Sequence, residues 1–216
     1  MNKKPILIVA GEPYSVFSEI FFKSLKKLNL KRPIVLIGSK NIFKQQMKKL
    51  GYRYYFEEMD KNLSKKIITK KKIINIINVQ FNFKKTFDKI TNKSNRYINE
   101  CFFTANNLLN NEKAYALING PISKKNFLKT KYLGVTEYLA EMNNVKDFAM
   151  LIYNKRLSVS PITTHIAIKK VSSQISKKKI INQVNLIRKF YYSLFRKKIK
   201  IGITGLNPHC ESNFKD

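Results

Sequence analysis

An α/β fold, with helices layered around a mostly parallel sheet, is the class that this sequence predicts. Continuous apolar runs of strand length, among them residues 5–10 and 33–38, alternate along the chain with segments whose apolar residues recur at helical spacing. A continuous apolar run is typical of a strand buried on both faces, as in a parallel sheet covered by helices. The alternation of the two patterns therefore indicates a layered α/β architecture.

The first elements form a predicted strand–helix–strand unit. The strand at residues 5–10 ends at Gly11, and apolar residues then recur at helical spacing over 17–28 before the second strand at 33–38. A second helix is expected over residues 41–50, with Gly51 as its stop, because glycine readily takes the left-handed conformation that follows a helix.

The remaining elements continue the alternation. Five more strands are predicted, at residues 73–79, 114–118, 149–153, 157–162 and 199–204. Residues 91–110 carry one strongly apolar helical face, which includes Cys101, and short helices are expected at 124–128 and 136–142. A long helix is expected to follow Ser176, because serine is a preferred residue at the N-cap position.

The charge of the chain is high but dispersed. Its 216 residues, enough for one domain or two small lobes, include 43 Lys and Arg against 13 Asp and Glu, a net charge of +30. The lysines are spread along the chain rather than gathered in a stripe, and no helix-turn-helix, zinc-finger or aromatic RNA-binding motif is visible. We therefore expect a solvated basic surface and no nucleic-acid partner, although the positive field favours a small anionic substrate.

The chain carries no sign of export or membrane insertion. No apolar stretch approaches the roughly 20 residues of a membrane span, and the first residues enter a strand at once. Two cysteines are too few for a disulfide framework. We expect a cytoplasmic protein with no membrane partner.

Several common catalytic motifs are missing. Gly11 is not followed by the further glycines of a GxGxxG dinucleotide turn, and there is no GxxxxGK[ST], HExxH or GxSxG string. Cys210 and His209 are neighbours on a loop, where adjacent side chains generally point apart, and no third residue is evident to orient them. A cysteine-nucleophile enzyme is therefore not expected.

The two histidines of the chain, His165 and His209, each lie just beyond a predicted strand. Ligands collect beyond the carboxyl ends of strands in such sheets, and imidazole is a common ligand for divalent metals. A catalytic metal site takes about three protein ligands, so these two alone are incomplete. The alternative is a surface or hydrogen-bonded histidine at each place.

Five strings along the chain, in this order, resemble the 4-hydroxythreonine-4-phosphate dehydrogenase family of vitamin B6 synthesis. They are Gly11 and Pro13 with Glu19-Ile20; Gly120-Pro121-Ile122 with Lys124; Gly134 with Thr136-Glu137 and Leu139-Ala140-Glu141; Thr163-Thr164-His165; and Gly205-Leu206-Asn207-Pro208-His209. The resemblance implies a two-lobed fold like that of isocitrate and isopropylmalate dehydrogenases, with a lobe boundary near residues 120–135. It also implies that residues 1–216 correspond to the N-terminal two-thirds of the enzyme, without its C-terminal third.

The activity that the resemblance implies is oxidation of 4-phosphohydroxy-L-threonine by NAD or NADP, followed by decarboxylation to 3-amino-2-oxopropyl phosphate. In the family a divalent metal (Zn, Mg or Co) is bound by histidines that match His165 and His209, and a threonine that matches Thr136 contacts the substrate. The third metal histidine and most cofactor contacts of the family lie beyond the residues present here. A homodimer with the site at its interface is implied as well.

The family's substrate-contacting histidine is replaced by Val135 in this chain. Loss of that polar group costs about 1–3 kcal/mol if its partner stays unpaired. Two alternatives therefore stay open: a degenerate or truncated relative without catalytic activity, and a dehydrogenase of the same family acting on another hydroxy acid. A basic nucleic-acid binder is the third, and a steep loss of affinity with salt would be its signature.

Overall fold

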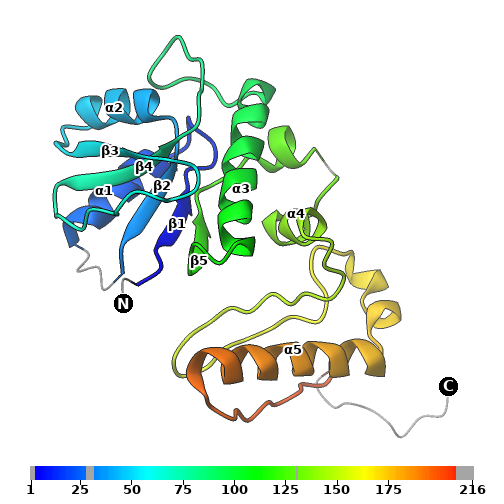
Figure 1. Ribbon diagram of the computed structural model, residues 1–216. Coiled ribbons are helices and arrows are strands. Elements are labelled where there is room, and N and C mark those ends of the chain that lie inside the picture. The colour runs from blue at the N-terminus through cyan, green and yellow to red at the C-terminus, as the bar shows by residue number, and fades with distance from the viewer. Residues whose placement is uncertain (1–2, 28–31, 130, 208–216) are drawn as a thin grey trace, which may run out of the picture. The chain divides into compact units, whose positions relative to one another are not determined.

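The computed structural model describes residues 3–27, 32–129 and 131–207. The chain divides into two compact units, residues 1–131 and residues 132–216, which we call the first and the second unit (Figure 1). None of the described helices combines the length and the apolar character needed to cross a membrane.

The first unit is built on a five-stranded parallel sheet, as the apolar runs predicted. Its strands are β1 (Ile6–Val9), β2 (Ile34–Gly38), β3 (Tyr55–Met59), β4 (Ile73–Asn78) and β5 (Ala116–Asn119), in the spatial order β3-β4-β2-β1-β5. Every neighbouring pair is parallel. The predicted α/β class is confirmed.

Helices cover both faces of this sheet. Helices α1 (Phe17–Lys27) and α2 (Lys40–Lys49) pack their aromatic side chains, Phe22 and Phe43 among them, against Leu36, Ile74 and Ile76 in one buried cluster. Helix α3 (Asn95–Asn110) contacts β1, β2 and β5. Successive strand residues point to opposite faces, so Val35 and Ile37 lie on the face opposite Leu36. Because side chains on both faces are buried, the sequences of these strands are uninterrupted apolar runs.

Two details of the first unit refine the sequence interpretation. Gly51 has a φ of +72°, the left-handed conformation expected of a residue that ends a helix. Strand β3 was not predicted, because its sequence Tyr-Phe-Glu-Glu-Met lacks a continuous apolar run. It pairs with β4 at the edge of the sheet, and Met59 is its one buried side chain, so the strand forms without a continuous apolar run.

The described residues of the second unit form two α-helices and little other regular structure. Helix α4 spans Val135–Met142 and α5 spans Lys177–Phe195, with short 3-10 turns at Ile168–Lys170 and Ser172–Gln174. The predicted cap is confirmed: the Ser176 side chain accepts a hydrogen bond from the Lys179 backbone N–H at 3.2 Å.

Three predicted strands of the second unit are wrong. Residues 149–153 and 157–162 form only a single antiparallel bridge, between Ile152 and Val159, and residues 199–204 have no regular structure. The apolar pattern is present in all three segments. Strand backbone must pair with a neighbour, and the described part of the second unit offers no sheet to join.

Candidate functional site

The carboxyl ends of β1 and β5 meet through two glycines. A Cβ on Gly11, whose φ is +72°, would lie 2.4 Å from the Pro121 carbonyl oxygen, and one on Gly120 would lie 2.2 Å from the Ala10 carbonyl oxygen. The Glu12 N–H donates to the Pro121 oxygen at 2.8 Å. The string that begins at Gly11 and the string that begins at Gly120 therefore form one close backbone contact at the carboxyl ends of the strands.

Glu12 is a buried carboxyl group at this edge. Its side chain accepts a hydrogen bond from the Ser94 hydroxyl at 2.8 Å through Oε2. Its Oε1 atom receives no hydrogen bond from any residue that the structure describes. Burial raises the pKa of Glu12, partly offset by the Ser94 bond. Glu12 was not among the predicted site residues, although its place directly after Gly11 at a strand end is a signal in the sequence.

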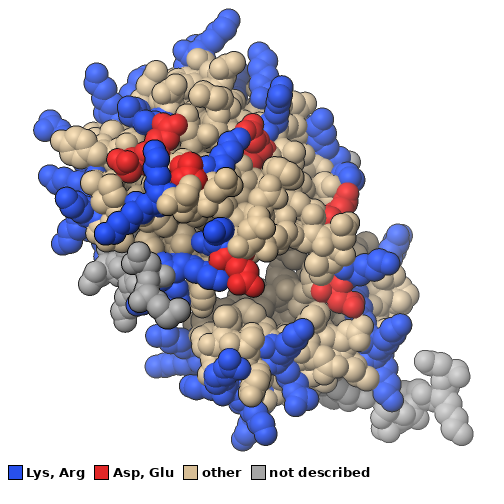
Figure 2. Space-filling view, in the orientation of Figure 1, with Lys and Arg blue, Asp and Glu red and all other residues tan. Residues whose placement is uncertain are grey.

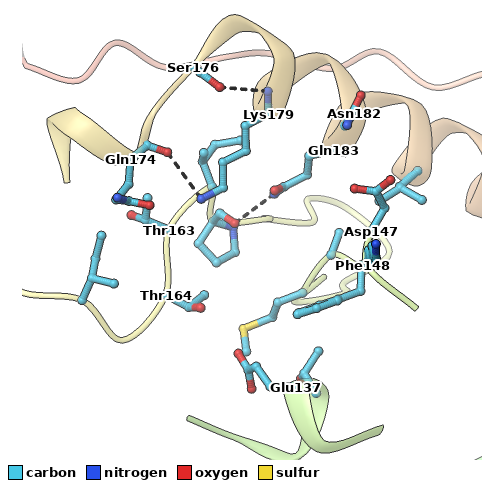
Figure 3. Close-up of a pocket in the computed structure, with 18 of the residues that line it drawn as sticks. Glu137, Asp147, Phe148, Thr163, Thr164, Gln174, Ser176, Lys179, Asn182 and Gln183 are labelled. Atoms are coloured by element: carbon cyan, nitrogen blue, oxygen red, sulfur yellow. Dashed lines mark hydrogen bonds between the residues drawn. The ribbon is translucent and has the colours of Figure 1, made fainter. Parts of the chain in front are cut away.

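The second unit contains an open hollow of about 490 Å³ with many hydroxyl, amide and ammonium groups. Thr136, at the start of α4, lines it. Thr163 and Thr164 line it as well (Figure 3). Other polar groups on its wall are Glu137, Lys146, Asp147, Gln174, Ser176, Lys178, Lys179, Asn182 and Gln183. Segments far apart in the sequence thus bring the predicted substrate threonine, Thr136, to one hollow with Thr163 and Thr164.

Helix α5 holds one wall of this hollow in place. The Gln183 amide donates to the Ser160 hydroxyl at 2.7 Å and to the Pro161 carbonyl at 2.9 Å, which ties the segment before Thr163 to the helix. The Lys179 ammonium donates to the Gln174 carbonyl at 3.4 Å. Three lysines, Lys146, Lys178 and Lys179, border the hollow against two carboxylates, so it suits an anionic, hydroxylated molecule.

The structure places the three predicted site residues differently. Thr136 lines the hollow, whereas His165 is exposed and is not part of its wall, although Thr164 and Ile166 on either side of it are. His165 has a φ of +55°, an uncommon conformation for a residue other than glycine. His209 lies outside the described residues. Among the residues that are described, no group of three or more His, Cys, Asp or Glu side chains could hold a metal ion.

Val135 is the first residue of α4 and is half-buried. It does not belong to the wall of the hollow, although its neighbour Thr136 does. The lysines at the start of α5 were not predicted as site residues, because only the fold brings the N-terminus of that helix beside Thr163 and Thr164.

Comparison with known proteins places these features in a family. Residues 29–214 match the family described as PdxA, pyridoxal phosphate biosynthetic protein PdxA. The chain is 36% identical over 213 residues to the 4-hydroxythreonine-4-phosphate dehydrogenase of Sulfurihydrogenibium sp. (strain YO3AOP1), covering 96% of this chain and 64% of that protein. It is 24% identical over 219 residues to the D-threonate 4-phosphate dehydrogenase of Salmonella typhimurium, covering 99% and 66%.

A solved structure shares the fold. The chain superposes on the 4-hydroxythreonine-4-phosphate dehydrogenase of Klebsiella pneumoniae with a TM-score of 0.82 at 23% identity, over 96% of this chain and 65% of that one. The chain thus spans about two-thirds of the length of the relatives that it matches.

Proposed function

This chain belongs to the PdxA family of pyridoxal phosphate biosynthetic proteins, and on that premise we propose that it serves the NAD- or NADP-dependent oxidation and decarboxylation of 4-phosphohydroxy-L-threonine. The product, 3-amino-2-oxopropyl phosphate, would supply vitamin B6 synthesis in the cytoplasm. The observation that carries the proposal is the hollow that Thr136 shares with Thr163 and Thr164. Its polar wall suits a phosphorylated hydroxy acid.

Residues of the hollow have distinct roles in this proposal. The Thr136 hydroxyl binds and orients the substrate, while Lys178 and Lys179 attract its negative charges. His165 and His209 are the proposed ligands of a divalent metal. The described residues provide only one of these two imidazoles and do not by themselves fit a complete metal site.

A second substrate is favoured by one observation. Val135 stands where the family has a substrate-contacting histidine, and the Salmonella typhimurium relative is named for D-threonate 4-phosphate. Val135 adjoins Thr136 without lining the hollow, and a site whose surroundings lack that polar group discriminates less strongly in favour of a substrate that needs it. The chain would then oxidise D-threonate 4-phosphate or a related hydroxy acid.

We also propose that the chain acts as a homodimer with the site at the interface. The second unit exposes many large apolar side chains, including Phe190, Leu194 and Phe195 on α5. Apolar surface of this kind marks an interaction surface in other proteins. Light scattering of the protein in solution measures the expected dimer directly.

The test is an assay of NADH and NADPH formation with both substrates, in the presence of Zn²⁺, Mg²⁺ or Co²⁺. Thr136→Val removes the hydroxyl and keeps the shape of the side chain, and it should lower kcat/KM by about tenfold or more. Thr69→Val, the same change at an exposed position of the first unit, should leave kcat/KM unchanged. An equal loss in both variants would contradict a substrate contact at Thr136.

Two further variants separate the alternatives. Val135→His should raise the preference for 4-phosphohydroxy-L-threonine over D-threonate 4-phosphate if position 135 reads the substrate. His165→Ala and His209→Ala should each weaken Zn²⁺ binding measured by calorimetry, and unchanged affinity would contradict the ligand assignment. Absence of turnover with every substrate, cofactor and metal combination would favour the non-catalytic relative.

A further inference from the structure

We propose that the amino-terminal edge of the sheet in the first unit carries a separate binding site for a small molecule with two or more adjacent phosphates. The site consists of Lys26, Lys27, Arg53, Lys71 and Lys72 around a hollow with Tyr52 and Tyr54 at its base. It lies at the opposite edge of this sheet from Gly11 and Gly120. The inference does not depend on the dehydrogenase activity.

Three separate segments build this hollow of about 660 Å³. Lys26 and Lys27 end α1, Arg53 lies in the turn between α2 and β3, and Lys71 with Lys72 immediately precedes β4. All three segments stand at the amino-terminal edge because the strands they adjoin are parallel. The parallel sheet therefore gathers cations that are far apart in the sequence.

The charge of this hollow is unbalanced. The described residues of its wall include five that are cationic and none that is a carboxylate. The ion pairs found among the described residues engage other lysines, namely Lys4, Lys23, Lys40 and Lys61. Like charges that converge on a concave, partly apolar surface repel one another and concentrate their field in it. A bound polyanion would relieve that repulsion.

Helix preference explains only part of this cluster. Lysines are favourable at the C-terminus of a helix because they complement its dipole, which accounts for Lys26 and Lys27. Lys71 and Lys72 lie outside any helix and have no such reason to be there. Elsewhere the Lys and Arg side chains are scattered over the visible surface, as Figure 2 shows. Convergence on one hollow distinguishes these five residues from the diffuse charge.

The aromatic base of the hollow is anchored in the core. The rings of Tyr52 and Tyr54 stack on Phe22 with centroid distances of 5.3 and 5.8 Å, and Phe22 is fully buried. The Lys26 ammonium lies 4.7 Å from the Tyr52 ring centroid, which fixes it over the base by a cation–π contact. The protonated Tyr54 hydroxyl is a potential donor to a phosphate oxygen, and burial raises its pKa further above neutral pH.

The confined shape favours a small polyphosphate over a nucleic acid. The volume of the hollow falls within the range of roughly 300–1,000 Å³ typical of small-ligand sites. A nucleic-acid surface needs a basic track or stripe along the backbone, and this cluster is a single cavity. Inorganic polyphosphate and a nucleoside triphosphate share the required chemistry of linked phosphates, so both serve as probes.

The experiment is calorimetric titration of the full chain with sodium tripolyphosphate, with ATP and with a single-stranded oligonucleotide. The quadruple variant K26Q/K27Q/K71Q/K72Q should bind tripolyphosphate about tenfold more weakly or worse, since each lost contact is charge-assisted. The matched control, K65Q/K66Q/K84Q/K85Q, removes the same charge from exposed positions of the first unit. It should change the affinity by less than about threefold.

Location and ligand class have separate readouts. Tripolyphosphate should protect backbone amides of residues 52–55 and 71–73 from hydrogen exchange in the wild type and not in the quadruple variant. Equal losses in the two variants, or protection confined to the second unit, would overturn the site. If the oligonucleotide binds more tightly than tripolyphosphate and this binding is lost in the quadruple variant, the site binds nucleic acid and the small-ligand proposal is wrong. Similar affinities for ATP and tripolyphosphate would show that the site recognises the phosphates alone. Tighter binding of ATP would show that the nucleoside is contacted as well.

Discussion

The two units of this chain differ in how their apolar residues are used. In the first unit, strand and helix side chains such as Leu7, Phe22 and Ile98 are fully buried around the sheet. In the described part of the second unit, Tyr138 and Ala140 are the only buried apolar residues, while large side chains such as Phe190 and Ile203 are exposed. The two regions have similar apolar patterns but different amounts of backbone pairing.

This difference shows which elements can form locally. Helix α5 needs only its own backbone hydrogen bonds and its Ser176 cap, and it forms in the second unit as predicted. A strand needs a neighbour, and residues 199–204 have none among the described residues. We therefore expect the first unit to dominate the stability of the chain, and the following substitutions test that expectation.

The largest effect is expected for Phe22→Ala in the first unit. Loss of a fully buried phenylalanine costs about 3–5 kcal/mol through lost burial and the cavity that remains. Phe195→Ala in the second unit removes a side chain that is 42% exposed and should cost only about 1 kcal/mol. Hydrogen exchange by mass spectrometry reports the two units separately. Equal loss of protection for the two variants would contradict the difference between them.

A smaller but clear effect is expected for Gly120→Ala. The new Cβ would lie 2.2 Å from the Ala10 oxygen and 2.7 Å from Phe17, and a backbone atom cannot move aside cheaply. We expect a loss of about 3 kcal/mol in the free energy of unfolding, from denaturant titration. Gly202→Ala in the second unit meets no atom within 4 Å and should stay within about 0.5 kcal/mol of the wild type. A tolerated Gly120→Ala would mean that the two turns are not closely packed.

Ser176→Ala tests whether local capping matters more in the second unit, where burial is low. The Ser176 side chain bonds the Lys179 N–H at 3.2 Å, and its loss should cost about 1 kcal/mol and increase exchange in the first turn of α5. Ser172→Ala, a nearby exposed serine whose side chain caps nothing, should have little effect. Unchanged exchange in α5 for both variants would show that the cap is dispensable.

Glu12→Gln should leave the free energy of unfolding in acid unchanged and should alter how that free energy varies with pH. Because burial raises the pKa of Glu12 in the fold, the unfolded chain loses its proton first as pH rises from 4.5. The wild type therefore loses stability as the pH rises from 4.5 to the raised pKa of Glu12, and the glutamine variant does not. The variant should match the wild type in acid and be the more stable protein above the raised pKa.

Asp60→Asn should change the pH dependence of stability in the opposite direction to Glu12→Gln. Hydrogen bonds from Ser64 and the backbone lower the pKa of Asp60, so its stabilising effect is present above the ordinary pKa of 3.8 and is lost as pH falls further. The asparagine variant should therefore lose stability relative to the wild type as pH rises through this acid range. Melting curves at a series of pH values measure both slopes, and slopes of the same sign would contradict the contrast between the Glu12 and Asp60 carboxyl groups.

The candidate site was predicted in part. The string around Thr136 and the string Thr163-Thr164-His165 were identified from residue types and order, and the fold brings Thr136, Thr163 and Thr164 to one hollow. The roles of His165 and His209 as metal ligands stay predictions. Lys178 and Lys179 were not identified, because a lysine in a chain with 43 basic residues carries no local signal of a site.

The sequence by itself determined the elements with a clear helical or apolar pattern: helices α1, α2, α3, α4 and α5, and the apolar strands β1, β2, β4 and β5. Tertiary structure decided the rest. It paired the polar edge strand β3, left residues 199–204 unpaired, and gathered Lys26, Arg53 and Lys71 at one edge of the sheet. The physical reason is that a helix closes its hydrogen bonds within itself, whereas a strand or a binding site depends on partners that are distant in the chain.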